Sequence, residues 1–243
     1  MRIAYISDLH SNIQAVEALE KDLKEKRIDE IRCLGDIVGY GARPKEVVEW
    51  VMENCKISLR GNHDTLVSDA EHIIILHPEV LEVAEWTVDQ LEDKHLDFLR
   101  NLEKDYEEEN TILTHDEPCI PGSMYYVTKL KDAKDTLSSY TEQFCFYGHT
   151  HLPKIFVKNT ETKEVNEIIT TKYKIKDEEQ YLINVGSVGQ PRDKDPRLCY
   201  LIHDTEDKTL EYIRVEYDVE GAYKDIKNAG LPVAFAERLI IGK

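Results

Sequence analysis

Short apolar segments alternate with amphipathic ones along the first half of the chain, and this alternation restricts the fold more than any other feature. Residues 2–7, 31–34 and 56–60 are typical of buried strands. Helices are expected between them, one over residues 13–25 and one that begins at Pro44, a residue well suited to a first helical turn. This order of strands and helices predicts an α/β fold.

Strands predominate in the second half. The expected strands cover residues 111–114, 144–147, 154–157, 164–170, 181–185, 199–202 and 210–217. The remaining helices are expected over residues 78–102, 132–140, 219–229 and 232–240. No internal repeat, low-complexity tract or Pro/Gly/Ser-rich linker divides the sequence, so a single domain over residues 1–243 is predicted.

The composition argues against several classes of protein. With 41% apolar and 33% charged residues, the chain is expected to be soluble and globular, and no segment resembles a membrane span or a signal peptide. A cytoplasmic location is therefore expected. The five cysteines are odd in number and scattered, which favours reduced thiols over disulfides. The net charge of -17 disfavours a nucleic-acid partner, although bound metal ions can still attract a small phosphate ester.

Polar residues directly follow five of the expected strands. They occur after the strand that ends at Thr114 and in the motifs SDLHSN (7–12), GDIVGYG (35–41), GNHD (61–64) and GHTH (148–151). Because ligands of α/β sheets bind outside the carboxyl ends of strands, these side chains are expected to meet at one edge. Each motif alone could be an ordinary turn, but GNHD is expected by chance in roughly one chain in a thousand.

The residue types in these motifs are those of a metal site. Imidazoles and carboxylates suit zinc, manganese, iron or nickel, whereas magnesium sites rarely use so many imidazoles. Seven ligands are too many for one ion that must also leave room for water and substrate, so two ions are expected. The seven candidates are Asp8, His10, Asp36, Asn62, His115, His149 and His151.

In this order, the motifs resemble the signature of the calcineurin-like metallophosphoesterase superfamily, over a stretch from Asp8 to Asp193. The resemblance implies a four-layer α/β/β/α sandwich with two central mixed β-sheets. The implied ligand sets are Asp8, His10 and His151 for one ion, Asn62, His115 and His149 for the other, and Asp36 for both. Manganese is the first expectation for the two divalent ions, with iron, nickel or zinc as alternatives.

The same resemblance implies a chemistry. A water that bridges the ions as hydroxide would attack phosphorus in line, while both ions neutralise charge on the phosphoryl oxygens. His63 would protonate the leaving group, a contribution of about 10²- to 10⁴-fold in rate. The expected enzyme is a dinuclear-metal-dependent phosphoesterase for a small phosphodiester, phosphomonoester or nucleotide. A nuclease acting on nucleic acid and a non-catalytic metal-binding scaffold subunit are the alternatives.

GDIVGYG departs from the pattern of the phosphoprotein phosphatases. Those enzymes carry GDxxDRG, whose second Asp pairs with the catalytic His and whose Arg binds phosphate, whereas Gly39 and Tyr40 stand at these positions here. The segment NVGSVGQPRD (184–193) is instead similar to the small bacterial and archaeal phosphodiesterase-like members. With no acid at Gly39, Asp64 is the expected partner that orients His63.

Three further residues are candidates for substrate contact. Arg192 could bind phosphate or could pair with Asp193 or Asp195. Asn12 could reach the substrate, although a helix cap is the preferred interpretation. Tyr40 could stack on a nucleobase, although simple packing is more usual for such an aromatic residue.

The loops over residues 65–78 and 116–128 are expected to shape the substrate pocket. Asp116, which follows a candidate ligand directly, is expected to narrow or acidify the mouth of the site. The histidines outside the motifs are expected to have structural roles. These are His72, His77, His95 and His203.

Overall fold

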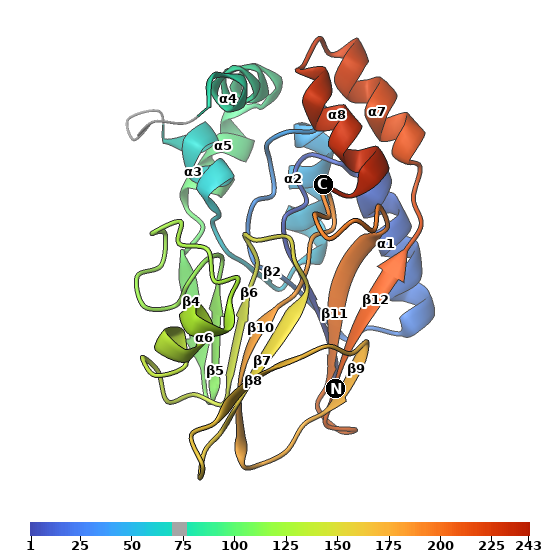
Figure 1. Ribbon diagram of the computed structural model, residues 1–243. Helices are drawn as coiled ribbons and strands as arrows, with labels where there is room; N and C mark the ends of the chain where they lie inside the picture. The colour runs from blue at the N-terminus through green and yellow to red at the C-terminus, as the bar shows by residue number, and fades with distance from the viewer. Residues whose placement is uncertain (70–76) are drawn as a thin grey trace.

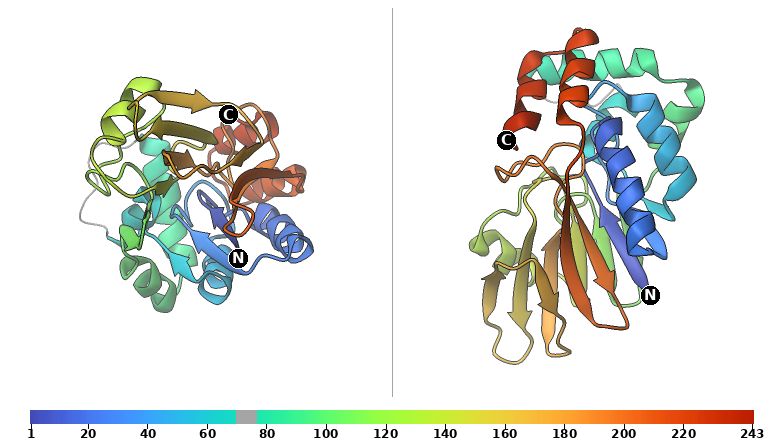
Figure 2. Two further views of the ribbon diagram at one scale, coloured as in Figure 1. Left: turned by 90° about the horizontal axis from the view of Figure 1, so that it is seen from below. Right: turned by 90° about the vertical axis from the view of Figure 1, so that its right-hand side faces the viewer.

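Two β-sheets pack face to face, with helices on their outer faces, in the computed structural model, which describes residues 1–69 and 77–243 (Figure 1). Both sheets are mixed, and each has six strands within the described residues. Figure 2 shows the succession of layers from two further directions. The predicted four-layer α/β/β/α sandwich with two central mixed sheets is confirmed.

The first sheet combines strands from both ends of the chain, in the order β3-β2-β1-β11-β12-β9. Its strands are β1 (Arg2–Ile6), β2 (Glu30–Cys33), β3 (Ile57–Ser58), β9 (Lys172–Lys174), β11 (Leu198–Asp204) and β12 (Thr209–Val215). Strands β1, β2 and β3 run parallel, and β11 pairs antiparallel with β1. The carboxyl ends of β1, β2 and β3 therefore lie at one edge of this sheet.

The second sheet has the order β4-β5-β6-β10-β7-β8. Its strands are β4 (Asp105–Glu108), β5 (Thr111–Thr114), β6 (Phe144–Tyr147), β7 (Lys154–Asn159), β8 (Val165–Ile168) and β10 (Glu179–Asn184). Strands β5, β6 and β10 run parallel. The loops after β5 and β6 meet those of the first sheet at the upper ends of the strands in Figure 1, below helices α4, α7 and α8.

Helices cover both outer faces and the upper end. They are α1 (Ile13–Lys26), α2 (Pro44–Asn54), α3 (Asn62–Ser68), α4 (Pro78–Gln90), α5 (Asp93–Arg100), α6 (Leu130–Thr136), α7 (Val219–Asn228) and α8 (Val233–Ile241). Helices α1 and α2 lie on the first sheet and α6 lies on the second, whereas α7 and α8 lie near the end where the parallel strands stop (Figure 1).

Three buried clusters correspond to the three interfaces between the layers. One joins the first sheet to α1 and α2, one lies between the sheets, and one joins the second sheet to α6. Between the sheets, Tyr5 of β1 stacks on Phe146 of β6, with ring centroids 3.9 Å and planes 9° apart. Each of these rings comes three residues before a candidate ligand, Asp8 and His149 respectively.

The segment 78–102 forms two helices instead of the single one expected. Helix α4 ends at Gln90, and α5 starts at Asp93 with Glu92 as its N-cap. The backbone N–H of Glu92 donates to Nδ1 of His95 at 3.0 Å, which satisfies a donor at the new helix start and explains the break. Strands β4 and β9 and helix α3 have no counterpart among the expected elements, and β3 and α6 are shorter than expected.

Three expectations concern the thiols, the membrane and the loop over residues 65–78. All five cysteines are free, and three of them are buried. Among the helices of residues 1–69 and 77–243, none is long and apolar enough to cross a membrane. Residues 70–76, which include His72 and the middle of the loop expected to shape the pocket, lie outside the described residues.

The start of α1 yields a prediction about Asn12. Its Oδ1 accepts a hydrogen bond from the N–H of Ala15 at 3.1 Å and its Nδ2 donates to the carbonyl of Gly189 at 2.8 Å, which confirms the helix-cap interpretation. Asn12→Ala removes both bonds and should lower the free energy of unfolding, measured by chemical denaturation, by about 1–2 kcal/mol. Asn12→Ser, which keeps a capping oxygen, should lose less. Wild-type stability of Asn12→Ala would contradict the cap.

Candidate metal centre

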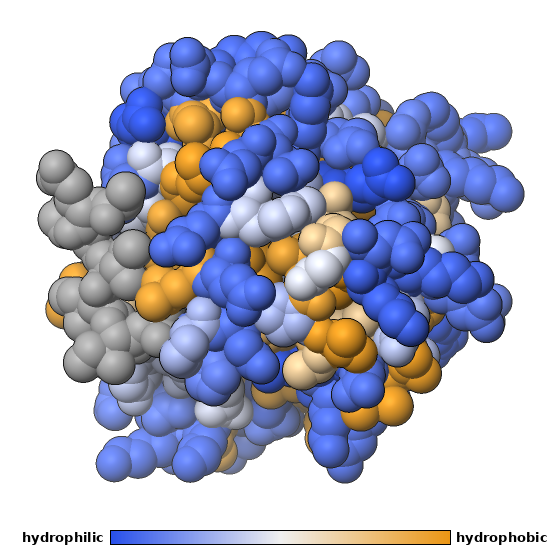
Figure 3. Space-filling view, turned by 90° about the horizontal axis from the view of Figure 1, so that it is seen from above, coloured by the Kyte–Doolittle hydropathy of each residue, from blue (hydrophilic) through white to orange (hydrophobic). Residues whose placement is uncertain are grey.

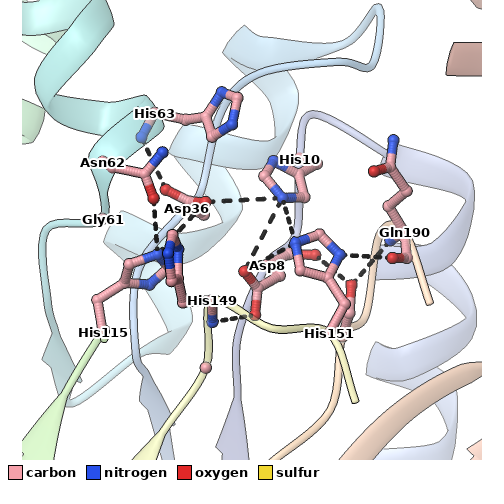
Figure 4. Close-up of polar contacts among 12 residues, drawn as sticks. Asp8, His10, Asp36, Gly61, Asn62, His63, His115, His149, His151 and Gln190 are labelled. Carbon is pink, nitrogen blue, oxygen red and sulfur yellow. Dashed lines mark hydrogen bonds and ion pairs between the residues drawn. The ribbon is translucent and has the colours of Figure 1, made fainter. Parts of the chain in front are cut away.

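The four polar motifs and His115 meet at the end of the sandwich where loops from both sheets face one another (Figure 4). The loops after β1, β2 and β3 belong to the first sheet, and those after β5 and β6 to the second. The edge expected from the sequence is therefore shared by two sheets. Six of the seven candidate ligands are buried, and Asn62 is partly exposed.

Asp8, His10 and His151 form a first group of ligand atoms, all within 4.8 Å of one another. Nε2 of His151 is 3.2 Å from Oδ1 of Asp8 and also 3.2 Å from Nε2 of His10. These are the three residues that the resemblance implies for one ion.

Asp36, His115 and His149 form a second group, again within 4.8 Å of one another. The side-chain oxygen of Asn62 lies 3.2 Å from Nε2 of His115 and so joins this group. Oδ2 of Asp36 lies 3.4 Å from Nε2 of His115 and 3.7 Å from Nε2 of His10. One carboxylate oxygen therefore faces both groups, which is the position of a bridging ligand.

Backbone carbonyls orient the imidazole rings. The Nδ1 partners are the carbonyls of Val38 at 3.1 Å for His10, of Leu34 at 2.9 Å for His115 and of Gln190 at 2.6 Å for His151. Because a carbonyl only accepts, Nδ1 carries a proton in each ring, and Nε2 is the nitrogen that faces the centre. His149 is reversed, since its Nε2 donates to the carbonyl of Met124 at 3.3 Å and Nδ1 is left as the ligand atom.

The backbone at the ligands has an uncommon conformation. Five of the seven candidates have φ between 47° and 64°, in the left-handed region: Asp8, His10, Asp36, His149 and His151. Such residues cost about 1–3 kcal/mol each and cluster at functional sites. Backbone hydrogen bonds hold the turns, for example from Asp8 N–H to the Gly35 carbonyl at 3.0 Å. The loops are therefore shaped to present these side chains.

Burial determines the protonation of most of the imidazoles. It lowers the pKa of His149 to about 3 and those of His10 and His151 well below the usual value, so these rings are neutral and can act as ligands. For His115, burial is outweighed by the adjacent Asp36 carboxylate, and the pKa is raised to about 10. A proton on His115 thus supplies positive charge beside Asp36. A cation that binds to His115 would displace this proton.

The donor set fits two divalent cations. Asp8 is fully buried, Asp36 is 1% exposed, and Oδ1 of Asp8 has no hydrogen-bond donor among the described residues. Burial raises the pKa of Asp8 to about 7. Two neighbouring buried carboxylates are costly without positive charge, and cations between them and the imidazoles would offset that cost. Carboxylate, amide oxygen and imidazole together suit first-row transition metals.

Gly61 is required because the chain passes very close to Asp36. A Cβ at this position would lie 2.2 Å from Oδ1 and 2.4 Å from the backbone nitrogen of Asp36. Its φ of -85° is open to any residue, so close approach explains the glycine of GNHD. The residues after Gly61 form the first turn of helix α3 and not an isolated turn. The backbone N–H of His63 donates a hydrogen bond to Oδ1 of Asp36 at 2.8 Å.

Asp64 does not orient His63, so that prediction is wrong. Its Oδ1 accepts from the N–H groups of Ile37 at 2.9 Å and Val38 at 3.1 Å, and its Oδ2 accepts from the N–H of Gly61 at 2.9 Å. Consecutive helix residues point about 100° apart, so His63 and Asp64 face different surroundings. Asp64 instead fastens the loop after β2 to the start of α3.

His63 lies at the edge of the centre. One of its ring nitrogens is within 4.8 Å of the ligand atoms of His10 and Asp36. Its ring packs on Tyr40, with centroids 4.5 Å apart, and on His10, with centroids 5.0 Å apart. A Cβ at Gly39 would lie 2.5 Å from Nδ1 of His63. The ring therefore leaves no room for a side chain at the position of the protein-phosphatase acid.

Arg192 pairs with neither Asp193 nor Asp195, so this alternative is wrong. Both aspartates pair with other arginines. Nη2 of Arg192 donates to Oε1 of Gln190 at 2.8 Å, and the guanidinium carbon lies 5.6 Å from the centroid of the Tyr40 ring. A phosphate contact by Arg192 stays a prediction, as does stacking of a base on Tyr40.

Asp116 is buried and lines a cavity together with Asn62 and His115, so the expectation that it narrows or acidifies the mouth of the site stays a prediction. Its carboxylate accepts from the N–H groups of Gly122 at 2.9 Å and Met124 at 2.5 Å, which folds the loop after β5. That loop brings the Met124 carbonyl to His149 and places the Tyr126 ring 4.2 Å from the His149 ring. No motif in the sequence signals this support of a candidate ligand.

The other described histidines lie away from the centre, as expected. His95 is buried in the cap of α5, and His203 packs between the sheets, 5.1 Å from the ring centroid of Phe144. His77 is exposed at the start of α4 and lies 3.5 Å from Glu79.

Comparison with known proteins identifies the family. The family model of the calcineurin-like phosphoesterase superfamily domain matches residues 1–208. The chain belongs to this superfamily. A curated relative, an uncharacterized protein of Methanocaldococcus jannaschii, has 37% sequence identity with this chain. The match covers 99% of this chain and 98% of the relative.

Two solved structures share the fold over the entire chain. A metallophosphoesterase from Sphaerobacter thermophilus is 33% identical, with a TM-score of 0.89 over 100% of this chain and 99% of its own. A hypothetical protein from Pyrococcus horikoshii shares the fold at 20% identity, with a TM-score of 0.79 over 100% and 98% of the two chains. The resemblance seen in the motifs is confirmed, and the structural likeness to the Sphaerobacter thermophilus protein also covers helices α7 and α8 beyond residue 208.

The shared position of Asp36 yields a prediction about metal content. We expect the wild-type protein, loaded with Mn²⁺ and dialysed, to retain two ions per chain by elemental analysis. Asp36→Asn should weaken the binding of both ions about 10-fold or more, whereas Asp8→Asn should weaken one. Asp218→Asn, a change at the N-cap of α7, is the control and should retain both. Two tightly held ions in Asp36→Asn would contradict the bridge.

Proposed function

We propose that the protein is a dinuclear-metal-dependent phosphoesterase that hydrolyses a small phosphodiester, phosphomonoester or nucleotide. The observation that carries this proposal is the position of Oδ2 of Asp36, 3.7 Å from Nε2 of His10 and 3.4 Å from Nε2 of His115. A carboxylate shared by two buried ligand groups favours a pair of ions over a single one. Membership of the superfamily supports a phosphoric ester as substrate.

Two divalent ions bound to these groups would supply an activated water and neutralise charge on the phosphoryl oxygens. Manganese is the first candidate, and iron, nickel or zinc are alternatives. The protein's own contribution is to hold seven ligand atoms in fixed directions at a largely buried site, where electrostatic interactions are stronger than in water.

A cavity of about 280 Å³ beside the second ligand group supports a small substrate. Asn62 and His115 form part of its wall, Lys104 adds a cation, and Leu66 and Met124 add apolar surface. This size is close to the lower limit of ordinary ligand pockets. The upper face of the molecule is mostly hydrophilic, with apolar residues in separate groups (Figure 3). A phosphate ester with a compact organic group would match this mixture.

His63 is the proposed proton donor, and Arg192 the proposed phosphate contact. The His63 side chain extends from α3 on the side of Asp36 and His10 away from the strands, and it is 8% exposed (Figure 4). Its backbone N–H is fixed by Asp36, so the donor and the bridging ligand are placed together. Arg192 pairs with no carboxylate among the described residues, which leaves its charge for a substrate phosphate.

Metal removal and replacement test the proposal. Chelated protein should hydrolyse neither an aryl phosphomonoester nor a bis-aryl phosphodiester, and adding Mn²⁺, Ni²⁺ or Zn²⁺ separately should restore hydrolysis of at least one ester. Asp36→Asn, treated identically, should stay inactive. Failure of every metal to restore wild-type activity would reject the enzyme and favour a scaffold. Faster, strongly salt-dependent cleavage of single-stranded DNA would favour a nuclease.

Replacement of His63 tests the proton donor. His63→Ala should keep its metal content but hydrolyse an ester with a poor leaving group about 10²- to 10⁴-fold more slowly. An ester of an acidic phenol should be affected less, because its leaving group needs no proton. His77→Ala, at an exposed site, is the control. Undiminished turnover of the poor-leaving-group ester by metal-replete His63→Ala would refute this role.

A further inference from the structure

The ring of His63 has no hydrogen-bond partner among the described residues that would fix its orientation. Gly39 stands where the protein phosphatases carry an acid, and Asp64 is hydrogen-bonded to backbone N–H groups. A proton donor must nevertheless be held accurately, because a misplacement of about 1 Å costs roughly 100-fold in rate. Some other contact has to restrict this ring.

Packing supplies that restriction on three sides of the ring. Tyr40 lies 4.5 Å away between centroids with planes 54° apart, and His10 lies 5.0 Å away with planes 82° apart. The backbone of Gly39 occupies the third side, close to Nδ1 of His63. His10 is itself fixed by the carbonyl of Val38, so Tyr40 is the neighbour whose role is unassigned.

Tyr40 is held in turn by the C-terminal part of the chain. The ring of Phe235 in α8, only 2% exposed, lies 4.9 Å from the Tyr40 ring with planes 55° apart. The guanidinium of Arg192 lies over the same ring at 5.6 Å. Gly39 and Tyr40 have φ of 97° and 56°, so two successive left-handed residues set the direction of the Tyr40 side chain. Left-handed backbone at a non-glycine residue, as at Tyr40, is found most often at functional sites.

We propose that Tyr40, backed by Phe235 of α8, is the positioning residue of His63. Aromatic packing then replaces the carboxylate that performs this task in the protein phosphatases. Phe235 lies outside residues 1–208 that the family model matches, so the helical hairpin α7–α8 becomes part of the catalytic unit. The inference rests on the proposed function, in which His63 donates a proton.

Two substitutions separate the Tyr40 ring from its hydroxyl. Tyr40→Phe keeps the ring and should retain kcat within about 2-fold. Tyr40→Leu should lower kcat about 10-fold or more on an ester with a poor leaving group, with little change in KM. The loss should shrink on an ester of an acidic phenol, as for His63→Ala. Tyr106→Leu, at an exposed aromatic residue of β4, is the matched control and should behave as wild type.

A double-mutant cycle shows whether Tyr40 acts through His63. In a His63→Ala background, Tyr40→Leu should lower kcat by a further factor of less than about 2, because the group that Tyr40 positions is already absent. Phe235→Leu should give a weaker form of the Tyr40→Leu pattern, whereas Ile226→Val, in the same apolar cluster but on α7, should not. Losses that multiply, or that are equal for good and poor leaving groups, would overturn the proposal.

The orientation of the His63 ring can be observed without turnover. In crystal structures of the zinc-loaded proteins, the ring should have one orientation in the wild type and in Tyr40→Phe, and several in Tyr40→Leu. A single unchanged orientation in Tyr40→Leu would overturn the proposal even if activity falls. If the wild type hydrolyses no phosphate ester, the proposed function fails, while the ring orientation still decides whether Tyr40 positions His63.

Discussion

The burial of two neighbouring carboxylates is the constraint on which the rest of the site depends. Asp8 and Asp36 are almost inaccessible to solvent, and their mutual repulsion is tolerable only with positive charge beside them. Imidazoles and an amide oxygen surround the same space, and the Nδ1–H groups of His10, His115 and His151 point outwards to backbone carbonyls. The interior of this end of the sandwich is therefore organised for cations, and the loops have the shapes that this requires.

Those loops are fastened to one another by few bonds. Asp64 accepts from the backbone of the loop after β2 and from Gly61, while Oδ1 of Asp36 accepts from His63. Asp36, Asn62 and His63, the proposed bridging ligand, second-ion ligand and proton donor, thus belong to one hydrogen-bonded assembly at the start of α3. This arrangement permits left-handed backbone at the ligands, because neighbouring elements leave the strained turns no alternative conformation.

The ligand groups could be predicted from sequence because ligation is a property of side-chain type, and five strand ends located the side chains. The hydrogen-bond partners of Asp64 could not be predicted, because they depend on the direction in which α3 leaves the strand. Helix α3 itself has only seven residues, too few for a periodic apolar pattern to reveal it. The carbonyls of Leu34, Val38 and Gln190 are equally invisible, since every residue type has one. The contact of Phe235 with Tyr40 joins distant parts of the chain.

The stacked pair between the sheets has a consequence for evolution and engineering. Tyr5 and Phe146 lie in different sheets, and each is the next-to-last residue of a strand whose following loop carries candidate ligands. This aromatic contact therefore contributes to the spacing of the two sheets, each of which carries part of the candidate ligand set. A smaller or larger side chain at either position would change the spacing of the ligands as well as the packing energy. The packing of the core is thus coupled to the geometry of the candidate metal centre, and residues far from solvent would influence the spacing of its ligands.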